Sequence, residues 1–327
     1  MPFSFLQRPE PPLFLAPMSG VTDSAYRQVC RAFGADVVMS EFLSSEALRR
    51  DIAHVHVGAQ FSESERPIGI QIYGASPPAL SEAASMVSER YHPDFLDINF
   101  GCPVKKVVRT NGGSACLRDL DLVTTIIHDV REASAVPVSV KIRSGWDEAT
   151  RHPVEIGLRC QDAGAQMLIL HARTRSQMYG GSARWDEIAA LVETLDIPVV
   201  GNGDIVEPAD AARMWRDTGC AGMMIGRGCF GRPWLFRQAR SMLDGEQPIA
   251  DPGANARFEI ALQHRDLLVD LRGDSRHSAC EFRKHLGWYT KGLANSAGLR
   301  AKLHQIESLS EVDSIFEEYL KSMEIAA

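Results

Sequence analysis

The cysteine best placed for chemistry is Cys102, which stands between Gly101 and Pro103 just past an apolar run. Glycine and proline predict a loop at this point, and we expect the thiol to be exposed there and reactive. A thiol with an ordinary pKa of ~8.5 is protonated at neutral pH and can donate a proton. The chain's seven cysteines are scattered without any CxxC pair, so neither a disulfide framework nor a zinc site is predicted.

Two glycine-rich segments, GNGD at 201–204 and GRG at 226–228, each follow a short apolar run. Glycine lets backbone N–H groups approach an anion closely, and Arg227 adds positive charge. Either segment alone is explained by a tight turn, but the two together predict a phosphate site. Lys141 lies in an otherwise apolar run, where a buried charge needs a partner, and an anionic ligand would supply one.

Three further side chains in or next to apolar runs each allow two interpretations. His171 is either a satisfied core histidine or a ligand contact, and Arg173 and Arg175 just beyond it favour the second. Gln71 either offers a donor and an acceptor to a heterocycle or plugs the interior as a buried amide. Met18 either lies against a flat ring or fills the core.

Positive charge gathers near the same run ends. A charge run is usually a solvated surface, but here it is confined to one rim of an acidic protein, which favours an anionic substrate. No two carboxylates form a plausible acid/base pair, and no His/Asp/Glu cluster has the spacing of metal ligands, so no metal site is predicted. The expected rim cations are Lys105, Lys106, Arg109, Arg143, Arg173 and Arg175.

The elements that must position these residues are short runs rich in Val and Ile, separated by amphipathic helical stretches. Such runs are typical of a parallel sheet that helices cover on both faces. Eight units over about 230 residues predict an α/β fold, a closed (β/α)₈ TIM barrel, better than a doubly wound open sheet, and barrel active sites lie at the C-terminal strand ends. Helices are expected to open at Asp23, Ser76 and Pro208. The runs begin at Leu13, Asp36, Ile68, Phe95, Val136, Met167, Pro198 and Gly222.

The alternation ends after residue 243. We predict a catalytic barrel over residues 1–243, a Gly/Pro-rich linker over 244–256 and a small all-α C-terminal domain over 257–327. Three helices are expected there, in FEIALQHRDLLVDLR, CEFRKHLGWYTKGL and SEVDSIFEEYLKSM. Residues 257–302 carry nine Lys or Arg and five Asp or Glu, although the chain as a whole has a net charge of −7. Any contact with a polyanion must therefore be local.

The composition is that of an ordinary soluble enzyme, with 45% hydrophobic and 24% charged residues among 327. No apolar run approaches the ~18 residues of a membrane span, and the prolines and Glu10 near the start interrupt any signal peptide. We expect a cytoplasmic protein without membrane contact. The sequence gives no oligomeric state, and a monomer is favoured.

Six segments, in this order and spacing, resemble the bacterial tRNA-dihydrouridine synthases, and the B-type subfamily most closely. They are APMSGVTDSAYR, LDINFGCPVKKV, VKIRSGW, ILHARTR, GNGDI and MIGRG. The resemblance runs from about Leu13 to Ser308 and includes RKHLGWYTKGL. The segment around Cys102 is highly specific, whereas GNGD and GRG occur in many flavin barrels. One departure is Ala172, where the B-type proteins usually have glycine.

The resemblance implies an FMN-binding barrel and a helical tRNA-binding domain, which together reduce the C5=C6 bond of uridine in the tRNA D-loop with NADPH. It implies that Cys102 is the proton donor and that Asn99 helps to hold the uracil. No GxGxxG fingerprint is present, so NADPH is expected as a transient electron donor. The implied FMN contacts are Pro17, Met18, Ser19, Gln71, Lys141, His171, Asn202, Gly203, Asp204, Gly226 and Arg227.

Two other functions stay open at this point. A flavin barrel that reduces a small enone or a dihydroorotate-like substrate would not need the basic helical segment or the rim cations. A non-catalytic RNA-binding protein on a barrel scaffold would need neither Cys102 nor a flavin. Bound flavin and tRNA binding would separate the three.

Overall fold

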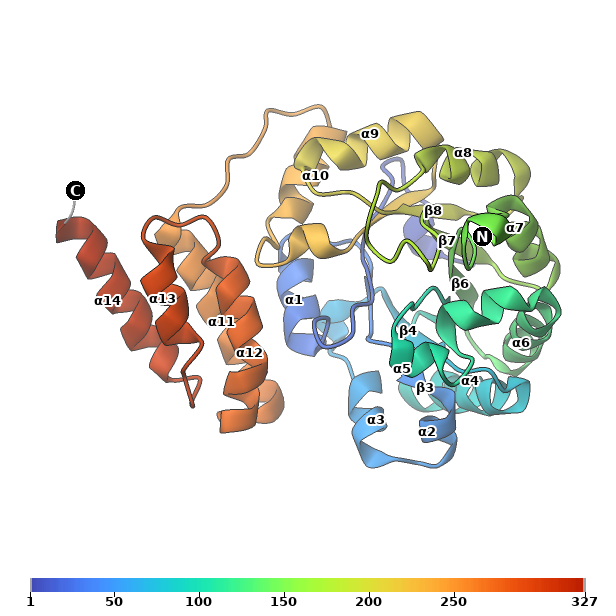
Figure 1. Cartoon of the computed structure of the whole chain (residues 1–327), viewed down its shortest axis with the longest axis horizontal. Helices are drawn as coiled ribbons and strands as arrows, with labels where there is room; N and C mark the ends of the chain where they lie inside the picture. Colours follow the sequence, from blue (N-terminus) through green and yellow to red (C-terminus); the bar gives the residue numbers. More distant parts are fainter. Residues whose placement is uncertain (1, 326–327) are drawn as a thin grey trace.

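Nine parallel strands form one sheet that curls into a barrel in the computed structural model, which describes residues 2–325 (Figure 1). The sheet order is β1-β9-β8-β7-β6-β5-β4-β2, and β3 also pairs with β4. Phe14 bridges Val37, and the Leu15 N–H donates to the Val37 carbonyl at 2.8 Å, which closes the ring. The strands are β1 (Leu13–Leu15), β2 (Val38–Met39), β3 (Leu43–Ser44), β4 (Ile68–Tyr73), β5 (Phe95–Phe100), β6 (Val138–Arg143), β7 (Met167–His171), β8 (Val199–Asn202) and β9 (Gly222–Ile225).

The predicted (β/α)₈ barrel is confirmed, with one difference in its second strand. That strand is split into β2 and β3, both of which pair with β4. The split lies at Ser40, whose hydroxyl oxygen accepts the Gln71 N–H at 3.0 Å, so a side chain replaces a backbone carbonyl in the ladder. The interruption makes two short strands out of one predicted run.

Helices surround the sheet and begin where the sequence predicts. The Asp23 carboxylate accepts the Tyr26 N–H, the Ser76 hydroxyl accepts the Ala79 N–H, and Pro208 occupies the first turn of its helix. The helices of this part are α1 (Ser24–Ala32), α2 (Ser45–Arg49), α3 (Ala53–Ala59), α4 (Pro77–Tyr91), α5 (Lys105–Val108), α6 (Leu120–Ala133), α7 (Pro153–Asp162), α8 (Trp185–Thr194), α9 (Pro208–Thr218) and α10 (Leu235–Leu243).

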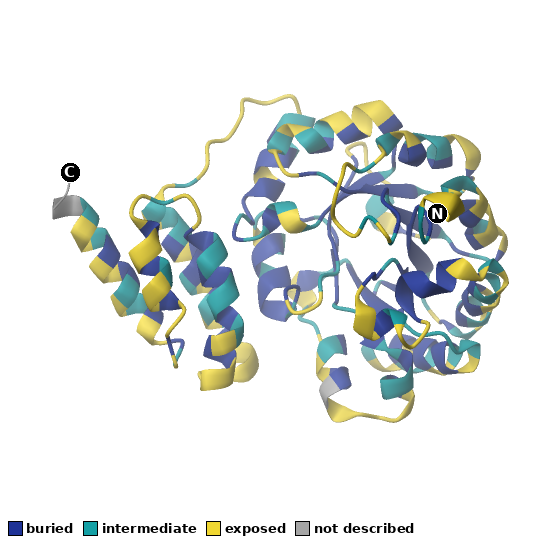
Figure 2. Ribbon diagram, in the orientation of Figure 1, coloured by how far each residue is buried: buried dark blue, intermediate teal, exposed yellow. Residues whose placement is uncertain are grey.

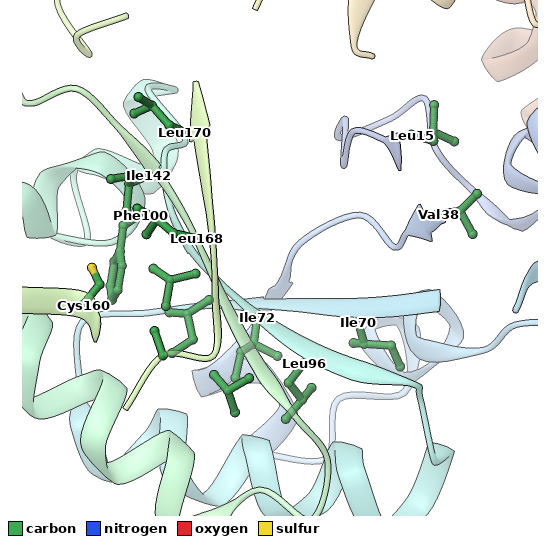
Figure 3. Packing of buried hydrophobic residues seen from close by; sticks show 14 of the residues in the cluster. Leu15, Val38, Ile70, Ile72, Leu96, Phe100, Ile142, Cys160, Leu168 and Leu170 are labelled. Carbon is green, nitrogen blue, oxygen red and sulfur yellow. The ribbon is translucent and has the colours of Figure 1, made fainter. Parts of the chain in front are cut away.

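Strand alternation divides the barrel's side chains between two apolar clusters. Leu96, Ile98 and Phe100 of β5 point outward into the cluster between sheet and helices, part of which is drawn in Figure 3. Phe95 of the same strand belongs to an inner cluster that Phe3 from the N-terminal segment closes from below, with ring centroids 5.8 Å apart. The inner positions nearer the C-terminal strand ends are polar, so the site lies on top of an apolar plug.

Four C-terminal helices stand beside the barrel, joined to it by an exposed segment (Figures 1 and 2). Their apolar cluster includes Ala25 and Val29 of α1 and Trp234, so the helices pack directly on the barrel. α11 begins four residues before Phe258, the first residue of the predicted helix, and α13 is an additional helix. Residue 1 and residues 326–327 of the predicted domains lie outside the described residues. The helices are α11 (Ala254–Arg272), α12 (Arg276–Tyr289), α13 (Ser296–Leu303) and α14 (Glu311–Ile325).

None of the helices within residues 2–325 is long and apolar enough to cross a membrane.

Candidate active site

Two adjoining cavities open at the C-terminal ends of the strands. The smaller, here called the glycine-loop cavity, has a volume of about 300 Å³ and is lined by His171, Arg173, Asn202–Asp204, Ile205, Val206, Met224 and Gly226–Gly228. The larger, the cysteine cavity, has a volume of about 550 Å³ and is lined by Ala16–Val21, Phe42, Asn99, Gly101–Val104, Lys141, Arg143, His171, Tyr179, Asn202, Arg227, Phe230, Lys284 and Trp288. Because His171, Asn202 and Arg227 line both, one ligand can extend from one cavity into the other.

The glycine-loop cavity is shaped by backbone that only glycine tolerates. Gly203 has φ +124°, and a Cβ there would lie 2.7 Å from that of Ala183 and 3.2 Å from the His171 ring. Arg227 is exposed at the rim, with its guanidinium 4.4 Å from the centre of the Tyr179 ring. A small cavity lined by glycine backbone and bordered by the Arg227 guanidinium suits a phosphate.

Asp204 and Arg173 neutralise each other beside this cavity. The Arg173 guanidinium lies 2.8 Å from one Asp204 carboxylate oxygen and donates to the other at 2.9 Å. Arg173 also donates to the Gly180 and Gly181 carbonyls and is only 2% exposed. The expectation that Arg173 is a rim cation is therefore wrong, because the loop after β7 folds over it.

Lys141 has a protein partner, contrary to the expectation that a ligand must supply one. Its ammonium donates to the Asn202 side-chain oxygen at 3.0 Å, and the Asn202 amide N–H donates to the Met224 carbonyl at 2.8 Å. Burial lowers the pKa of Lys141, and the carboxylate of Asp97 opposes that change. Lys141 lines the cysteine cavity and can still contact a ligand there.

His171 lines both cavities, as the ligand-contact interpretation predicts. Burial lowers its pKa well below the usual value, and the cations Arg143, Lys141, Arg173 and Arg227 lower it further. The imidazole is therefore neutral at physiological pH and can offer a hydrogen bond to a ligand without adding charge.

The side-chain amides of Gln71 and Asn99, both predicted to contact ligands, form a hydrogen bond with each other. The Gln71 oxygen accepts from the Asn99 amide at 2.7 Å, and the Gln71 amide donates to the Asp97 carboxylate at 2.7 Å. Gln71 is fully buried and lines neither cavity, so it fills the barrel interior as a buried amide. Asn99 lines the cysteine cavity, and its oxygen accepts the N–H groups of Gly101 and Cys102 at 3.0 and 2.8 Å.

Cys102 lies in the wall of the cysteine cavity and is 9% exposed, so the expectation of an exposed thiol is wrong. The loop folds inward because the Cys102 carbonyl accepts both the N–H and the hydroxyl of Ser114, at 3.1 and 2.8 Å. Burial raises the pKa of the thiol, against the lowering effects of the Val104 N–H and of the cations Arg143 and Lys141. The thiol is thus protonated at neutral pH and faces the cavity.

The six expected rim cations fall into two groups. Arg143 is 2% exposed, and its guanidinium donates to the carbonyls of Gly101, Thr174 and Met178 at 2.8, 2.9 and 2.8 Å. It therefore ties the Cys102 loop to the loop after β7 rather than standing at the rim. Arg175 is half-buried over the Trp146 ring at 4.4 Å. The three cations that are exposed are Lys105, Lys106 and Arg109, on α5 and at its end.

The cysteine cavity has a wall that the sequence analysis did not predict. Lys284 and Trp288 of α12 stand one turn apart and both line it, and Phe230 and Tyr179 complete the side. The segment RKHLGWYTKGL contains both α12 residues, so their helical spacing was the available signal. Asp97 was also missed, although it alternates with Asn99 along β5.

Within residues 2–325 no group of three or more His, Cys, Asp or Glu side chains is arranged to hold a metal ion. The seven cysteines are all free, and Cys280 is exposed whereas the others are buried.

A closed parallel barrel with a cavity above its seventh and eighth repeats, β8 and β9, defines the class of TIM-barrel proteins. The model of the dihydrouridine synthase (Dus) family matches residues 14–324, and the chain belongs to this family of oxidoreductases. Among curated relatives, it is 38% identical to tRNA-dihydrouridine synthase B of Shewanella oneidensis over 95% of this chain and 96% of that one. A probable tRNA-dihydrouridine synthase of Rickettsia conorii is 36% identical, with 95% and 94% covered.

Solved structures share the fold at low sequence identity. Histamine dehydrogenase from Rhizobium sp. 4-9 superposes with a TM-score of 0.52 and 13% identity, covering 78% of this chain and 48% of that one. An amine oxidase from Pseudomonas geniculata gives a TM-score of 0.51 and 14% identity, covering 71% and 47%. These likenesses show the fold alone.

Proposed function

We propose that this protein is a tRNA-dihydrouridine synthase that reduces the C5=C6 bond of uridine in the D-loop of tRNA, with FMN as cofactor and NADPH as electron source. Family membership supports the proposal, and one feature of the site carries it. Cys102, whose thiol is protonated, lines a cavity that adjoins the glycine-loop cavity and is closed on one side by the C-terminal helices. This geometry suits proton donation to a base beside a phosphorylated cofactor.

The residues fit FMN. Gly203 leaves room that a Cβ would fill, and Arg227 is exposed beside it, so the glycine-loop cavity suits the phosphate. The ring system would lie toward Pro17, Met18, Ser19, Lys141, His171 and Asn202, which line the cysteine cavity. Gly226 would contribute its backbone. Asp204, whose carboxylate is paired with Arg173, would likewise contribute only its backbone. Gln71 would not contact FMN directly, but it would help to orient Asn99, whose amide donates to the Gln71 oxygen.

When bound and reduced, FMN would supply the hydride that adds to C6 of the uracil. Addition at C6 would leave an enolate whose negative charge is shared between C5 and the C4 oxygen, and the Cys102 S–H bond would break to give C5 its proton. One C=C bond is lost, and two C–H bonds form. The neighbouring cations Lys141 and Arg143 stabilise the thiolate that remains, which then takes up a proton from water.

The target base must leave the tRNA fold to reach this cavity. We propose that the phosphates flanking the target base lie on the exposed cations Lys105, Lys106 and Arg109 and on the basic segment 257–302, within a helical tRNA-binding part over residues 257–327. Half-buried Arg175 is a further candidate contact. A tRNA substrate supports a cytoplasmic location for this proposed activity.

The test is to incubate the purified, FMN-loaded protein with NADPH and an unmodified tRNA transcript, and to map dihydrouridine by nuclease digestion and mass spectrometry. The proposal predicts a mass gain of two hydrogens at a D-loop uridine, which requires both NADPH and FMN. A protein that retains flavin and oxidises NADPH but leaves every uridine unreduced would contradict it. Reduction of a small enone in place of tRNA would identify the small-molecule alternative.

A further inference from the structure

A chain of hydrogen bonds runs through the barrel interior from Asp97 to the Cys102 loop. The Asp97 carboxylate accepts the Ser139 hydroxyl at 2.6 Å and the Gln71 amide at 2.7 Å. The Gln71 oxygen accepts the Asn99 amide at 2.7 Å, and the Asn99 oxygen accepts the Cys102 N–H at 2.8 Å. All four side chains are buried.

The two ends of this chain determine its direction. A side-chain amide can turn over, exchanging its donor and its acceptor at little cost. Burial raises the pKa of Asp97 to about 7, and the Ser139 hydroxyl, the Gln71 amide and the Lys141 charge act against that change. In its carboxylate form Asp97 only accepts, so the Gln71 NH₂ must face it and the Gln71 oxygen must face Asn99. The Cys102 N–H only donates, so it needs the Asn99 oxygen. One orientation of the two amides satisfies every bond.

We propose that Asp97 is a positioning residue that sets the orientation of both amides and thereby holds the Cys102 thiol in place. Without a fixed acceptor at that end, Gln71 can turn, and Asn99 then presents its NH₂ to the N–H groups of Gly101 and Cys102. Two donors would face each other, and the N–H groups of Gly101 and Cys102 would lose the acceptor that helps to hold the loop. The proposal deepens the proposed function, on which its kinetic readout rests.

Asp97→Asn is the critical variant because it keeps the shape but lets residue 97 donate or accept toward Gln71. The double variant Asp97→Asn/Gln71→Glu restores the direction of the hydrogen-bond chain. A carboxylate at position 71 accepts from the amides of residues 97 and 99, so Asn99 again faces an oxygen. Ser139→Ala is the matched control, because it removes the other hydrogen bond to Asp97 and leaves the amide chain intact. Thermal unfolding of each variant shows whether it folds.

The first readout is the rate at which iodoacetamide alkylates Cys102, followed on its own peptide by mass spectrometry across pH. We expect faster alkylation in Asp97→Asn, and rates near that of the parent in the double variant and in Ser139→Ala. The second readout is reoxidation of reduced flavin by tRNA, which should slow about 10- to 100-fold in Asp97→Asn while NADPH oxidation stays within about twofold.

The inference is overturned if Asp97→Asn matches the parent in alkylation, if the double variant reacts as fast as the single one, or if Ser139→Ala reproduces the effect of Asp97→Asn. Alkylation requires no uridine reduction. A parent enzyme that is inactive on tRNA would therefore refute the proposed function, while the alkylation series would still decide the role of Asp97.

Discussion

The rings of Phe230 and Trp288 stack with centroids 4.3 Å apart and planes 17° apart, which joins the barrel to helix α12 within the wall of the cysteine cavity. Phe230 follows β9, and Trp288 lies near the end of α12. The C-terminal helices therefore complete the cavity that contains Cys102, in addition to carrying the basic segment 257–302. Deleting residues after Leu243 would remove this wall and expose Ala25, Val29 and Trp234, so point variants test the helices more cleanly.

Gly231→Ala should disturb this wall selectively. A Cβ at Gly231 would lie 2.3 Å from the Trp288 carbonyl carbon, so α12 must move. Gly292→Ala is the matched control, because Gly292 also has positive φ but nothing lies within 4 Å of its Cβ position. Both should lose about 1 kcal/mol to backbone strain. In calorimetry Gly231→Ala should lose more unfolding free energy than Gly292→Ala. The rate at which tRNA reoxidises the reduced flavin should also fall further in Gly231→Ala. Equal losses in the two variants would contradict the tight packing of Gly231 against Trp288.

Lys284→Ala should weaken tRNA binding without affecting the flavin. Lys284 lines the cysteine cavity and forms no ion pair among the described residues, so it is available to a phosphate. The slope of log affinity against log salt should decrease in magnitude by roughly 1, as expected for one lost phosphate contact. Lys321→Ala in the acidic α14 is the control, and filter binding at several salt concentrations measures both. An unchanged salt slope in Lys284→Ala would show that no tRNA phosphate contacts Lys284.

Arg227→Ala should reduce FMN retention roughly tenfold, the usual contribution of one charged hydrogen bond to a phosphate. Its side chain lines both cavities and packs over Tyr179 rather than on a carboxylate. Arg216→Ala, on the exposed side of α9, removes the same charge far from the site. Fluorescence of FMN released during dialysis gives the affinity, and equal retention in both variants would show that the phosphate lies outside the glycine-loop cavity.

Loss of the Cys102 proton should make uridine reduction decline at alkaline pH. Burial raises the pKa of the Cys102 thiol, so the proton donor is present below that raised pKa and is lost as pH rises through it. The rate of flavin reoxidation by tRNA should therefore fall above the ~8.5 of an ordinary thiol. The alkaline fall should disappear in Cys102→Ala. A decline centred below pH 8 would assign the titration to another group.

The fold was largely predictable, because eight apolar runs with helices between them leave few arrangements other than a barrel. The sequence did not reveal the split after Met39, since it depends on a bond between the Ser40 hydroxyl and β4, thirty residues away. Helix α13 was missed because SAGLRAKL is short and contains glycine, so its local pattern is weak.

The site was predictable where strand ends alone determine it, as for Lys141, His171 and Asn202. The burial of Arg143 and Arg173 was not, because carbonyls from residues 174–181 fold back over both guanidinium groups. Asp97 could have been found from its period-two spacing with Asn99 in LDINF, which places both carboxylate and amide inside the barrel.

The most direct test of Cys102 as proton donor is stopped-flow reoxidation of the reduced, FMN-loaded Cys102→Ala variant by unmodified tRNA. We predict that reduction by NADPH keeps its rate, since it needs no proton on uracil, and that reoxidation by tRNA slows by roughly 10²–10⁴-fold. Cys280→Ala, which removes the exposed thiol, should behave as the parent in both steps. Reoxidation of Cys102→Ala by tRNA at the parent rate would contradict the account.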